Sequence, residues 1–128
     1  MLAQSLEHCL ELLSEHGDEA RLLAGGQSLL PSLALRLSAP ALLIDINRVQ
    51  EISAQPQVTS SVVRLPALTR HADLITSPVV QAYLPLLYRA APWIAHPGIR
   101  NRGTTGGSLA LGDPASELPA CAVAAGAT

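Results

Sequence analysis

The feature that most constrains the fold is a pair of adjacent glycines, Gly25-Gly26, set between a short apolar segment and a helical pattern. Residues 21–24 are predicted to form a strand, and residues 29–37 carry leucines at helical spacing. Pro40 closes that helix, and the continuous apolar run 41–46 is typical of a buried strand. The order strand, helix, strand predicts a βαβ unit whose two strands are parallel.

The glycine pair falls at the turn from strand to helix, which is a chemically informative position. Adjacent glycines allow positive φ and let a bulky ligand come within contact distance of main-chain N–H groups. The helix that follows is expected to offer unpaired N–H groups and a partial positive charge to an anion, and Ser28 adds a hydroxyl donor or a helix cap. A tight turn without a ligand explains the same glycines, since a glycine motif alone is weak support.

A second glycine turn, Thr104-Thr105-Gly106-Gly107-Ser108, strengthens the prediction of a phosphate site. Hydroxyl groups again surround two glycines, and two such turns can hold a pyrophosphate from opposite sides. The segment 103–110 alternates small residues with glycines and is predicted to be a strand or a bulged strand. A glycine-bulged strand without a ligand remains the alternative. If both turns hold a phosphate-bearing cofactor, valine at Gly26 or Gly107 is expected to abolish the binding of that cofactor.

The remaining segments complete a mixed pattern of helices and strands. Periodicity and β-branched content predict helix 3–16, strand 58–65, helix 69–91 and helix 115–125. Gly17 is expected to end the first helix, Pro78 to break the second into two pieces, and Asp113 to cap the last one. The sequence contains no internal repeat.

Charge and composition exclude several classes of function. The formal net charge is −2, and the basic residues are eight scattered arginines, of which Arg100 and Arg102 form the one close pair. The basic stripe of a nucleic-acid-binding surface is therefore missing, and 2% aromatic content leaves no base-stacking platform. A chain without lysine cannot form a Walker-type phosphate loop. Arg100 and Arg102 either contact a phosphate or a partner subunit, or bind loop carbonyl groups.

The potentially reactive side chains do not form a recognisable catalytic or metal-binding pattern. Cys9 and Cys121 lack metal-ligand spacing and are predicted to be free thiols in a reducing compartment. Each of the four histidines is predicted to lie on the surface or in a loop, with His71 the one candidate to approach a cofactor. No Ser-His-Asp or Cys-His arrangement indicates a hydrolase. We expect a cytoplasmic protein without a metal, a nucleic-acid partner or an inserted membrane segment.

The two turns, taken with their flanks, resemble a known family. The stretch 21–31, RLLAGGQSLLP, continues through 35–37 to 43–46, and the stretch 96–110, HPGIRNRGTTGGSLA, is followed by 113–120. These stretches resemble the two FAD-binding segments of the medium, flavin subunit of molybdenum hydroxylases. That family includes carbon monoxide dehydrogenase and the FAD domain of xanthine dehydrogenase. Residues 67–71 also fit, so that the resemblance covers nearly the whole chain in the same order.

The resemblance implies an α+β fold, that of an FAD-binding PCMH-like domain. It implies a βαβ FAD-binding subdomain over 1–50 and an incomplete second FAD-binding subdomain, with mainly antiparallel strands, over 51–128. It also implies FAD as the cofactor of an oxidoreductase component, which passes electrons from iron–sulfur clusters through the flavin to an acceptor. The implied partners are a molybdopterin-binding large subunit and a 2Fe-2S small subunit.

The resemblance also implies which residues contact FAD. The first turn and the backbone before it wrap the pyrophosphate, and the Thr-x-Gly-Gly turn contacts it from the other side. Ser116 and Glu117 match positions that hydrogen-bond sugar hydroxyls or the ribityl chain, and Leu23 and Ile99 match apolar positions against the flat parts. The matching positions are Leu22, Leu23, Ala24, Gly25, Gly26, Gln27, Ser28, Leu29, Ile99, Thr104, Gly106, Gly107, Ser108, Ala110, Ser116 and Glu117.

The chain also departs from the family pattern. It begins after the usual first strand and stops at Thr128, before further strands and a C-terminal domain that help to cover the isoalloxazine ring. Pro66 stands where the family usually has Gly, and Leu111-Gly112 replaces a common His-Ala. We therefore expect the isolated chain to bind FAD weakly or not at all. Two alternatives remain open: a truncated non-catalytic remnant or docking module, and a binder of another nucleotide such as ADP.

Overall fold

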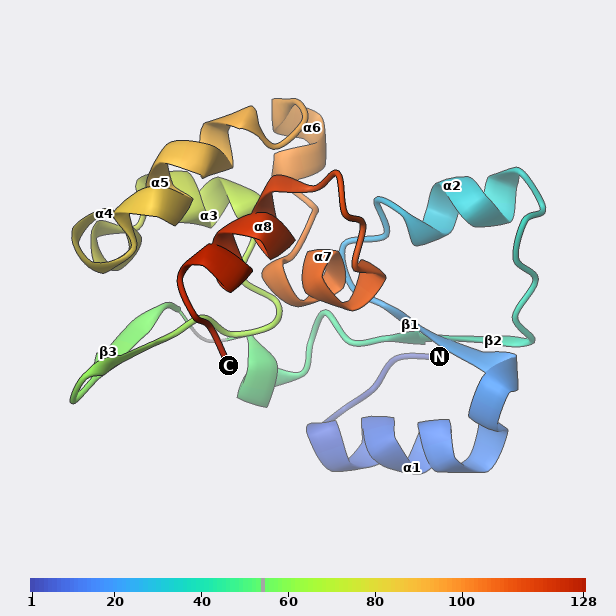
Figure 1. Ribbon diagram of the computed structural model, residues 1–128. Coiled ribbons are helices and arrows are strands. Elements are labelled where there is room, and N and C mark those ends of the chain that lie inside the picture. The colour runs from blue at the N-terminus through green and yellow to red at the C-terminus, as the bar shows by residue number, and fades with distance from the viewer. Residues whose placement is uncertain (54) are drawn as a thin grey trace.

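The computed structural model describes residues 1–53 and 55–128, and it combines short helices with two pairs of strands (Figure 1). The N-terminal elements are α1 (Leu6–His16), η1 (Gly17–Glu19), β1 (Ala20–Leu23), α2 (Leu29–Ala34), β2 (Leu42–Asp45) and η2 (Gln50–Ile52). The later elements are β3 (Gln57–Thr59), β4 (Val62–Arg64), α3 (His71–Thr76), α4 (Pro78–Tyr83), α5 (Pro85–Ala90), η3 (Ala91–Trp93), α6 (Pro97–Arg100), α7 (Thr105–Leu111) and α8 (Glu117–Ala124). One strand pair is parallel and the other antiparallel, which confirms the α+β class.

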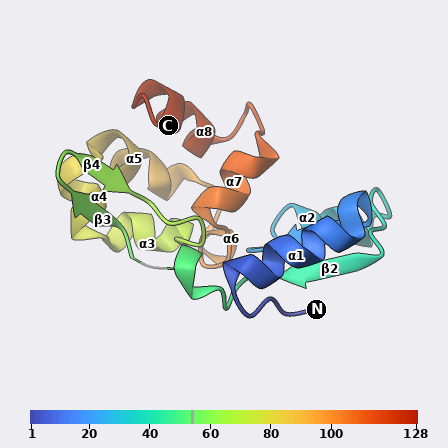
Figure 2. The same cartoon turned by 90° about the horizontal axis from the view of Figure 1, so that it is seen from below.

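The predicted βαβ unit is present. β1 and β2 pair in parallel, with Leu23 opposite Asp45, so both strands end at the same edge. α1 and α2 lie on opposite sides of this pair (Figures 1 and 2). α2 has only six residues, shorter than expected, because the chain leaves helical geometry at Arg36, whose φ is 56°. A helix this short contributes little dipole to the glycine turn that precedes it.

α1 is the predicted amphipathic helix, and both of its ends have a local cause. It begins at Leu6, later than predicted, because the Ser5 hydroxyl caps it by accepting from the N–H of His8 at 3.1 Å. It ends at Gly17 as predicted, where φ is 50° and the N–H donates to the carbonyl of Leu13. Its apolar face is thereby aimed at the sheet.

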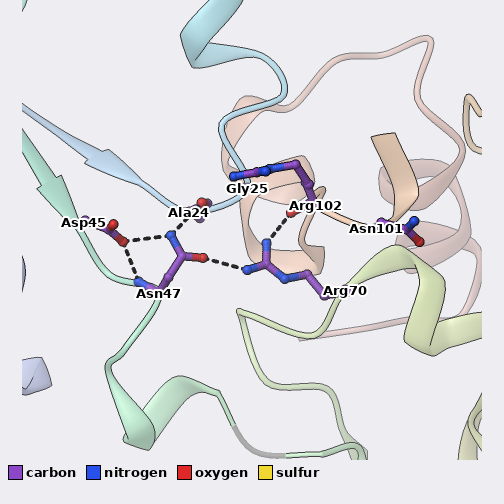
Figure 3. A pocket seen from close by; sticks show the side chains of 7 residues that line it. All are labelled: Ala24, Gly25, Asp45, Asn47, Arg70, Asn101 and Arg102. Carbon is purple, nitrogen blue, oxygen red and sulfur yellow. Dashed lines mark hydrogen bonds between the residues drawn. The ribbon is translucent and has the colours of Figure 1, made fainter. Parts of the chain in front are cut away.

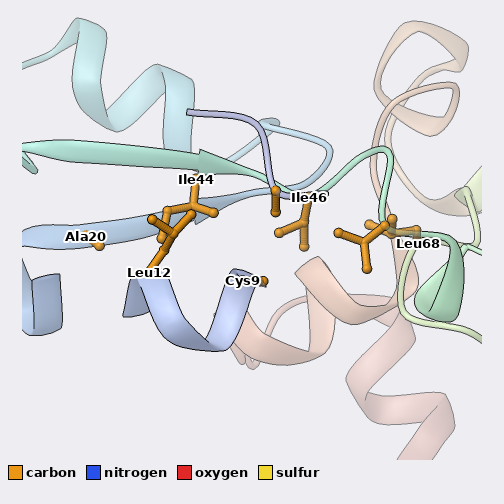
Figure 4. Close-up of a cluster of buried hydrophobic side chains, with 8 residues drawn as sticks. Cys9, Leu12, Ala20, Ile44, Ile46 and Leu68 are labelled. Atoms are coloured by element: carbon orange, nitrogen blue, oxygen red, sulfur yellow. The ribbon is translucent and has the colours of Figure 1, made fainter. Parts of the chain in front are cut away.

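The first hydrophobic core lies between α1 and the strands (Figure 4). Its members are aliphatic residues and one cysteine: Ala3, Cys9, Leu12, Ala20, Ile44, Ile46, Val49 and Leu68. Leu68 comes from the segment after β4, so this core extends past β2 into the second part of the chain. Cys9 is a buried free thiol, as is Cys121, and burial raises the pKa of both.

The second part of the chain is mainly helical. The prediction of one strand over 58–65 is wrong, because Ser60 takes φ 56° and folds the segment into the β3–β4 hairpin. The predicted helix 69–91 forms three helices instead of two, since Pro85 as well as Pro78 occupies a first helical turn. These helices pack with α8 around a second core, which shares no residue with the first: Leu74, Val80, Leu87, Ala91, Ile94, Leu118 and Cys121.

The second glycine turn has a different structure from the one predicted. The segment 103–110 is not a strand, because residues Thr105–Leu111 form helix α7. Thr104 is the N-cap, and its side-chain hydroxyl accepts from the N–H of Gly107 at 3.1 Å. The glycine pair thus lies in the first turn of a helix instead of in a β-bulge.

The last helix, α8, is present, but its predicted cap is wrong. Ser116 occupies the N-cap position, whereas the carboxylate of Asp113 accepts from the N–H of Ala115 at 2.9 Å in the preceding loop. An Asp two residues before a free N–H commonly forms such a local turn. Within residues 1–53 and 55–128, no helix combines the length and apolar character needed to cross a membrane.

Candidate functional site

A polar cleft of about 400 Å³ opens where the parallel strands end. The first glycine turn and the residues after β2 form one side, and Arg70 and the loop after α6 form the other (Figure 3). The lining residues are Ala24, Gly25, Asp45, Asn47, Arg70, Asn101 and Arg102. The carboxyl ends of parallel strands are the usual place for a ligand in sheets of this kind.

The first glycine turn, which lines this cleft through Ala24 and Gly25, carries unbonded main-chain donors. The N–H groups of residues 25–28 donate to no acceptor in the described part of the chain, and the turn is closed by the Gln27 amide, which donates to the carbonyl of Gly25 at 2.9 Å. Gly26 adopts φ 72°, a left-handed conformation that side chains disfavour. Consecutive N–H groups in such a turn form a concave site for an anion.

Gly25 marks a close approach between the two sides of the cleft. A Cβ at this position would overlap the carbonyl oxygen of Arg102 and would lie 2.9 Å from the Cα of Gly103. Both neighbours are backbone atoms, so no side-chain rotation can relieve the overlap. Glycine is required here for packing between the first turn and the loop that leads into the second.

The second glycine turn uses its donors internally. The N–H of Thr105 donates to the carbonyl of Thr69 at 2.9 Å, and that of Gly106 donates to the carbonyl of Ala67 at 2.8 Å. The N–H groups of Gly107 and Ser108 donate to the Oγ1 and carbonyl oxygen of Thr104. These bonds dock the turn onto residues 67–69. The N–H groups of residues 105–108 therefore have protein acceptors, unlike those of residues 25–28.

Of the residues expected at the cofactor, Ala24 and Gly25 line the cleft; Leu22, Leu23 and Leu29 flank the first turn in β1 and α2, and the others outside that turn lie near the second one. The hydroxyls of Ser108 and Ser116 are 3.2 Å apart, which holds the start of α8 against α7. Glu117 and Ile99 are half-buried, in α8 and α6, and Ala110 is exposed on α7. The structure thus groups the expected residues around two separate turns. Their individual contacts with FAD stay predictions.

Three cleft residues without a predicted cofactor role are joined by hydrogen bonds. The Asn47 Nδ2 donates to the carbonyl of Ala24 at 2.8 Å and to Asp45 Oδ1 at 2.7 Å, and the Asn47 Oδ1 accepts from Arg70 Nη2 at 2.7 Å. Arg70 Nη1 also donates to the carbonyl of Arg102. Asp45 was recognisable as the polar end of a strand, but the contact between Asn47 and Arg70 joins distant segments and leaves no sequence pattern.

Asp45 supplies the negative charge of the cleft. Burial disfavours its ionised form, but the hydrogen bonds from the Asn47 N–H and side chain, aided by nearby positive charges, lower the pKa of this carboxyl below its usual value. Against this one carboxylate stand the guanidinium groups of Arg70 and Arg102, and the Arg102 side chain reaches toward the first turn (Figure 3). The charges of the cleft therefore favour an anionic ligand.

Arg100 does not share this cleft. Its Nη1 donates to the carbonyl oxygens of Pro92, Ile94 and Ala95 at 2.8–3.0 Å. This is the carbonyl-binding alternative that the sequence left open for the arginine pair, and it applies to one member of the pair. In the described part of the chain, no group of three His, Cys, Asp or Glu side chains could hold a metal ion.

The prediction that His71 is a surface or loop residue is wrong, because it begins α3 and is 6% exposed. Its Nε2 lies 3.1 Å from the carbonyl oxygen of Thr104, which can only accept, so Nε2 carries the proton. Nδ1 is buried and has no hydrogen-bond partner in the described residues. Burial lowers the pKa of His71, and Arg70 acts in the same direction, against the opposing hydrogen bond to Thr104.

The lowered pKa of His71 predicts a loss of stability in acid. Well above pH 6.5, which is about the usual pKa of histidine, the His71 side chain is neutral in the folded and the unfolded chain, so its titration does not make stability depend on pH. Below that pH the unfolded chain takes up the proton first, so stability falls by up to about 1.4 kcal/mol per pH unit until the folded pKa is passed. Urea unfolding from pH 7.5 to 5 measures this loss, which should be smaller in His71→Gln, whose amide does not titrate. If the free energy of unfolding falls equally with pH in the unchanged chain and in His71→Gln, this prediction is contradicted.

Comparison with known proteins identifies the family to which this chain belongs. Residues 1–128, the whole chain, match the family described as "FAD binding domain in molybdopterin dehydrogenase". The chain belongs to this family. FAD is accordingly the cofactor of the domain, and the resemblance expected from the two glycine turns is confirmed.

Relatives of this FAD-binding domain agree in sequence and in structure. The chain is 54% identical over 119 residues to 6-hydroxypseudooxynicotine dehydrogenase complex subunit alpha of Paenarthrobacter nicotinovorans, covering 93% of this chain and 40% of that subunit. It is 49% identical over 121 residues to the carbon monoxide dehydrogenase medium chain of Hydrogenophaga pseudoflava, covering 94% of this chain and 42% of the relative. A solved structure of the Hydrogenophaga pseudoflava enzyme, lacking the Mo-pyranopterin moiety, matches with a TM-score of 0.93 and 48% identity over 96% of this chain and 42% of that one. The chain thus spans about two fifths of the length of these relatives.

The donor set of the cleft fits the cofactor of the family. FAD carries a pyrophosphate; the first turn provides open N–H groups, and the opposite side of the cleft provides Arg70 and Arg102, which are the donors that such an anion requires. The second turn fits less directly, because the N–H groups of residues 105–108 are already bonded. Within this FAD-binding domain, the first turn is therefore the better-equipped phosphate site.

Proposed function

We propose that this chain binds the ADP half of FAD in the polar cleft at the end of β1 and β2. In this proposal the chain is part of a molybdenum-dependent dehydrogenase. The observation that carries the proposal is a turn with open N–H groups at residues 25–28, which lines the cleft through Gly25, opposite two arginines of the same cleft. A bound FAD supplies the two-electron chemistry, while the chain's own residues bind and orient it. The first turn faces the pyrophosphate, and the second turn fixes the loop opposite.

We further propose that the chain passes electrons from iron–sulfur clusters through FAD to an acceptor, together with other subunits. The support is that relatives carry names such as "complex subunit alpha" and "medium chain". The partners of this proposal are a molybdopterin-binding large subunit and a 2Fe-2S small subunit. A cytoplasmic location belongs to the same proposal and is supported by the two buried free thiols, which are typical of reducing compartments.

A competition titration tests the binding proposal. FAD should bind weakly but saturably, and ADP should displace it. FMN should bind at least about tenfold more weakly than FAD, since FMN shares the ring but lacks the adenosine and the second phosphate. Flavin fluorescence and displacement by ADP measure the three affinities. ADP binding without FAD binding favours a binder of another nucleotide. Binding of neither ligand favours the docking-module alternative, and equal affinities for FMN and FAD contradict a site built for the ADP half.

A further inference from the structure

The two sides of the cleft belong to parts of the chain with separate hydrophobic cores. The strands β1 and β2 rest on the first core, and helices α3, α4, α5 and α8 of the later segment rest on the second. The clusters share no member, and Leu68 is the one residue after Ile52 that the first core includes in the described part of the chain, so apolar packing joins the two sides at one place only. Contacts across the cleft itself therefore add to this packing in holding the first glycine turn opposite the loop that leads to the second.

Arg70 makes such a contact with both sides at once (Figure 3). Its Nη2 donates to Asn47 Oδ1 at 2.7 Å, and its Nη1 donates to the carbonyl oxygen of Arg102. Asn47 in turn donates to the carbonyls of Ala24 at 2.8 Å and Leu23 at 3.3 Å, the residues just before the glycine pair. A continuous chain of hydrogen bonds therefore runs from the first turn through Arg70 to the opposite loop.

The position of Arg70 is fixed on its own element as well. Its backbone N–H donates to the side-chain carboxylate of Asp73 at 3.1 Å, which closes the first turn of α3. The next residue, His71, bonds through its N–H to the carbonyl of Gly103 at 3.0 Å and through Nε2 to that of Thr104. The backbone of residues 70–71 is thus pinned to the loop, and the guanidinium extends from that fixed point to Asn47.

We propose that Arg70 is a positioning residue, which sets the spacing between the first glycine turn and the loop 101–104 and thereby the affinity of the cleft for FAD. The inference rests on the proposed binding of FAD in this cleft. It assigns to Arg70 a role that a lysine cannot fill, because one ammonium group cannot reproduce the two diverging bonds of a planar guanidinium. The formal charge in the cleft is the same with arginine or with lysine at position 70.

The test compares Arg70→Lys with Arg100→Lys in the full chain. Arg100 also binds carbonyl oxygens, but those of residues 92–95, away from the cleft. We expect Arg70→Lys to weaken FAD binding about tenfold, the effect of losing one hydrogen bond to a charged group. Arg100→Lys should leave FAD affinity unchanged. It should lower the Tm of the FAD-free protein at least as much as Arg70→Lys does. Fluorescence titration well below both Tm values and thermal unfolding without FAD give the two readouts.

A double variant separates positioning from a direct contact between Arg70 and FAD. If Arg70 acts through Asn47, the combination of Asn47→Ala with Arg70→Lys should bind FAD about as weakly as the weaker single variant. Additive losses overturn the positioning role, as does unchanged FAD affinity in Arg70→Lys. Failure of the unchanged chain to bind FAD overturns the proposed function and this inference with it, whereas a failure confined to the variants overturns the inference alone.

Discussion

Alanine at Gly25 is expected to weaken FAD binding by roughly 5- to 150-fold, the equivalent of about 1–3 kcal/mol of overpacking. The added Cβ overlaps the carbonyl oxygen of Arg102 and meets the Cα of Gly103 at 2.9 Å. These are backbone atoms, so the first turn and the opposite loop must move apart. Such a movement widens the cleft and strains the link through Arg70. Titration with FAD, with ADP as competitor, measures the effect.

The matched control for this substitution is Gly98→Ala on α6. Neither glycine has a positive φ, so alanine brings no backbone strain at either site. At Gly98 the Cβ meets only the His96 side chain, at 3.2 Å, and that side chain can rotate away. FAD affinity should therefore be unchanged in Gly98→Ala. Wild-type affinity in Gly25→Ala would contradict the close approach across the cleft.

The structure changes the meaning of the valine substitutions suggested by the glycine pairs. Gly26 has φ 72°, so valine there strains the backbone whether or not a cofactor binds. A Cβ at Gly107 would lie 2.7 Å from the Oγ1 of Thr104, the cap of α7. Loss of FAD binding in either variant would thus mix steric exclusion with local misfolding. Gly25, where the clash is between the two sides of the cleft, gives a clearer result.

The βαβ unit was predictable because its signals are local. Apolar runs, helical spacing and the glycine pair lie next to each other in sequence, and the parallel pairing follows from the connection. The second turn was misassigned because glycines and threonines disfavour an isolated helix. Tertiary bonds from Thr105 and Gly106 to residues 67–69, together with the Thr104 cap, outweigh that preference.

The hairpin and the polar network were hidden for different reasons. The β3–β4 turn is made by Ser60 with a positive φ, so the glycine or asparagine that usually marks such a turn is missing. Asn47 and Arg70 are brought together by the packing of two parts of the chain, and no local spacing encodes that contact. Family resemblance located both turns, but only the structure shows that the N–H groups of residues 25–28 are open whereas those of residues 105–108 are bonded.

Alanine at Ile44 is expected to lower the free energy of unfolding by about 2–5 kcal/mol, the usual cost of such a truncation in a packed core. Ile44 is 0% exposed at the centre of β2 and packs with Cys9 and Leu12 of α1 (Figure 4). Ile44→Val should cost about 0.5–1.5 kcal/mol. Val62→Ala, at a hairpin residue that is 62% exposed, should change stability by less than about 0.5 kcal/mol. Urea unfolding orders the three variants.

The same variant separates stability from cofactor binding. Side chains alternate across a strand, so Ile44 points into the first core while the next residue, Asp45, lines the cleft. Ile44→Ala, measured well below its Tm, should therefore retain FAD affinity close to that of the unchanged chain, in contrast to Gly25→Ala. A large loss of FAD affinity in the folded Ile44→Ala protein would mean that the first core, and not the contacts of Gly25 and Arg70, sets the geometry of the cleft.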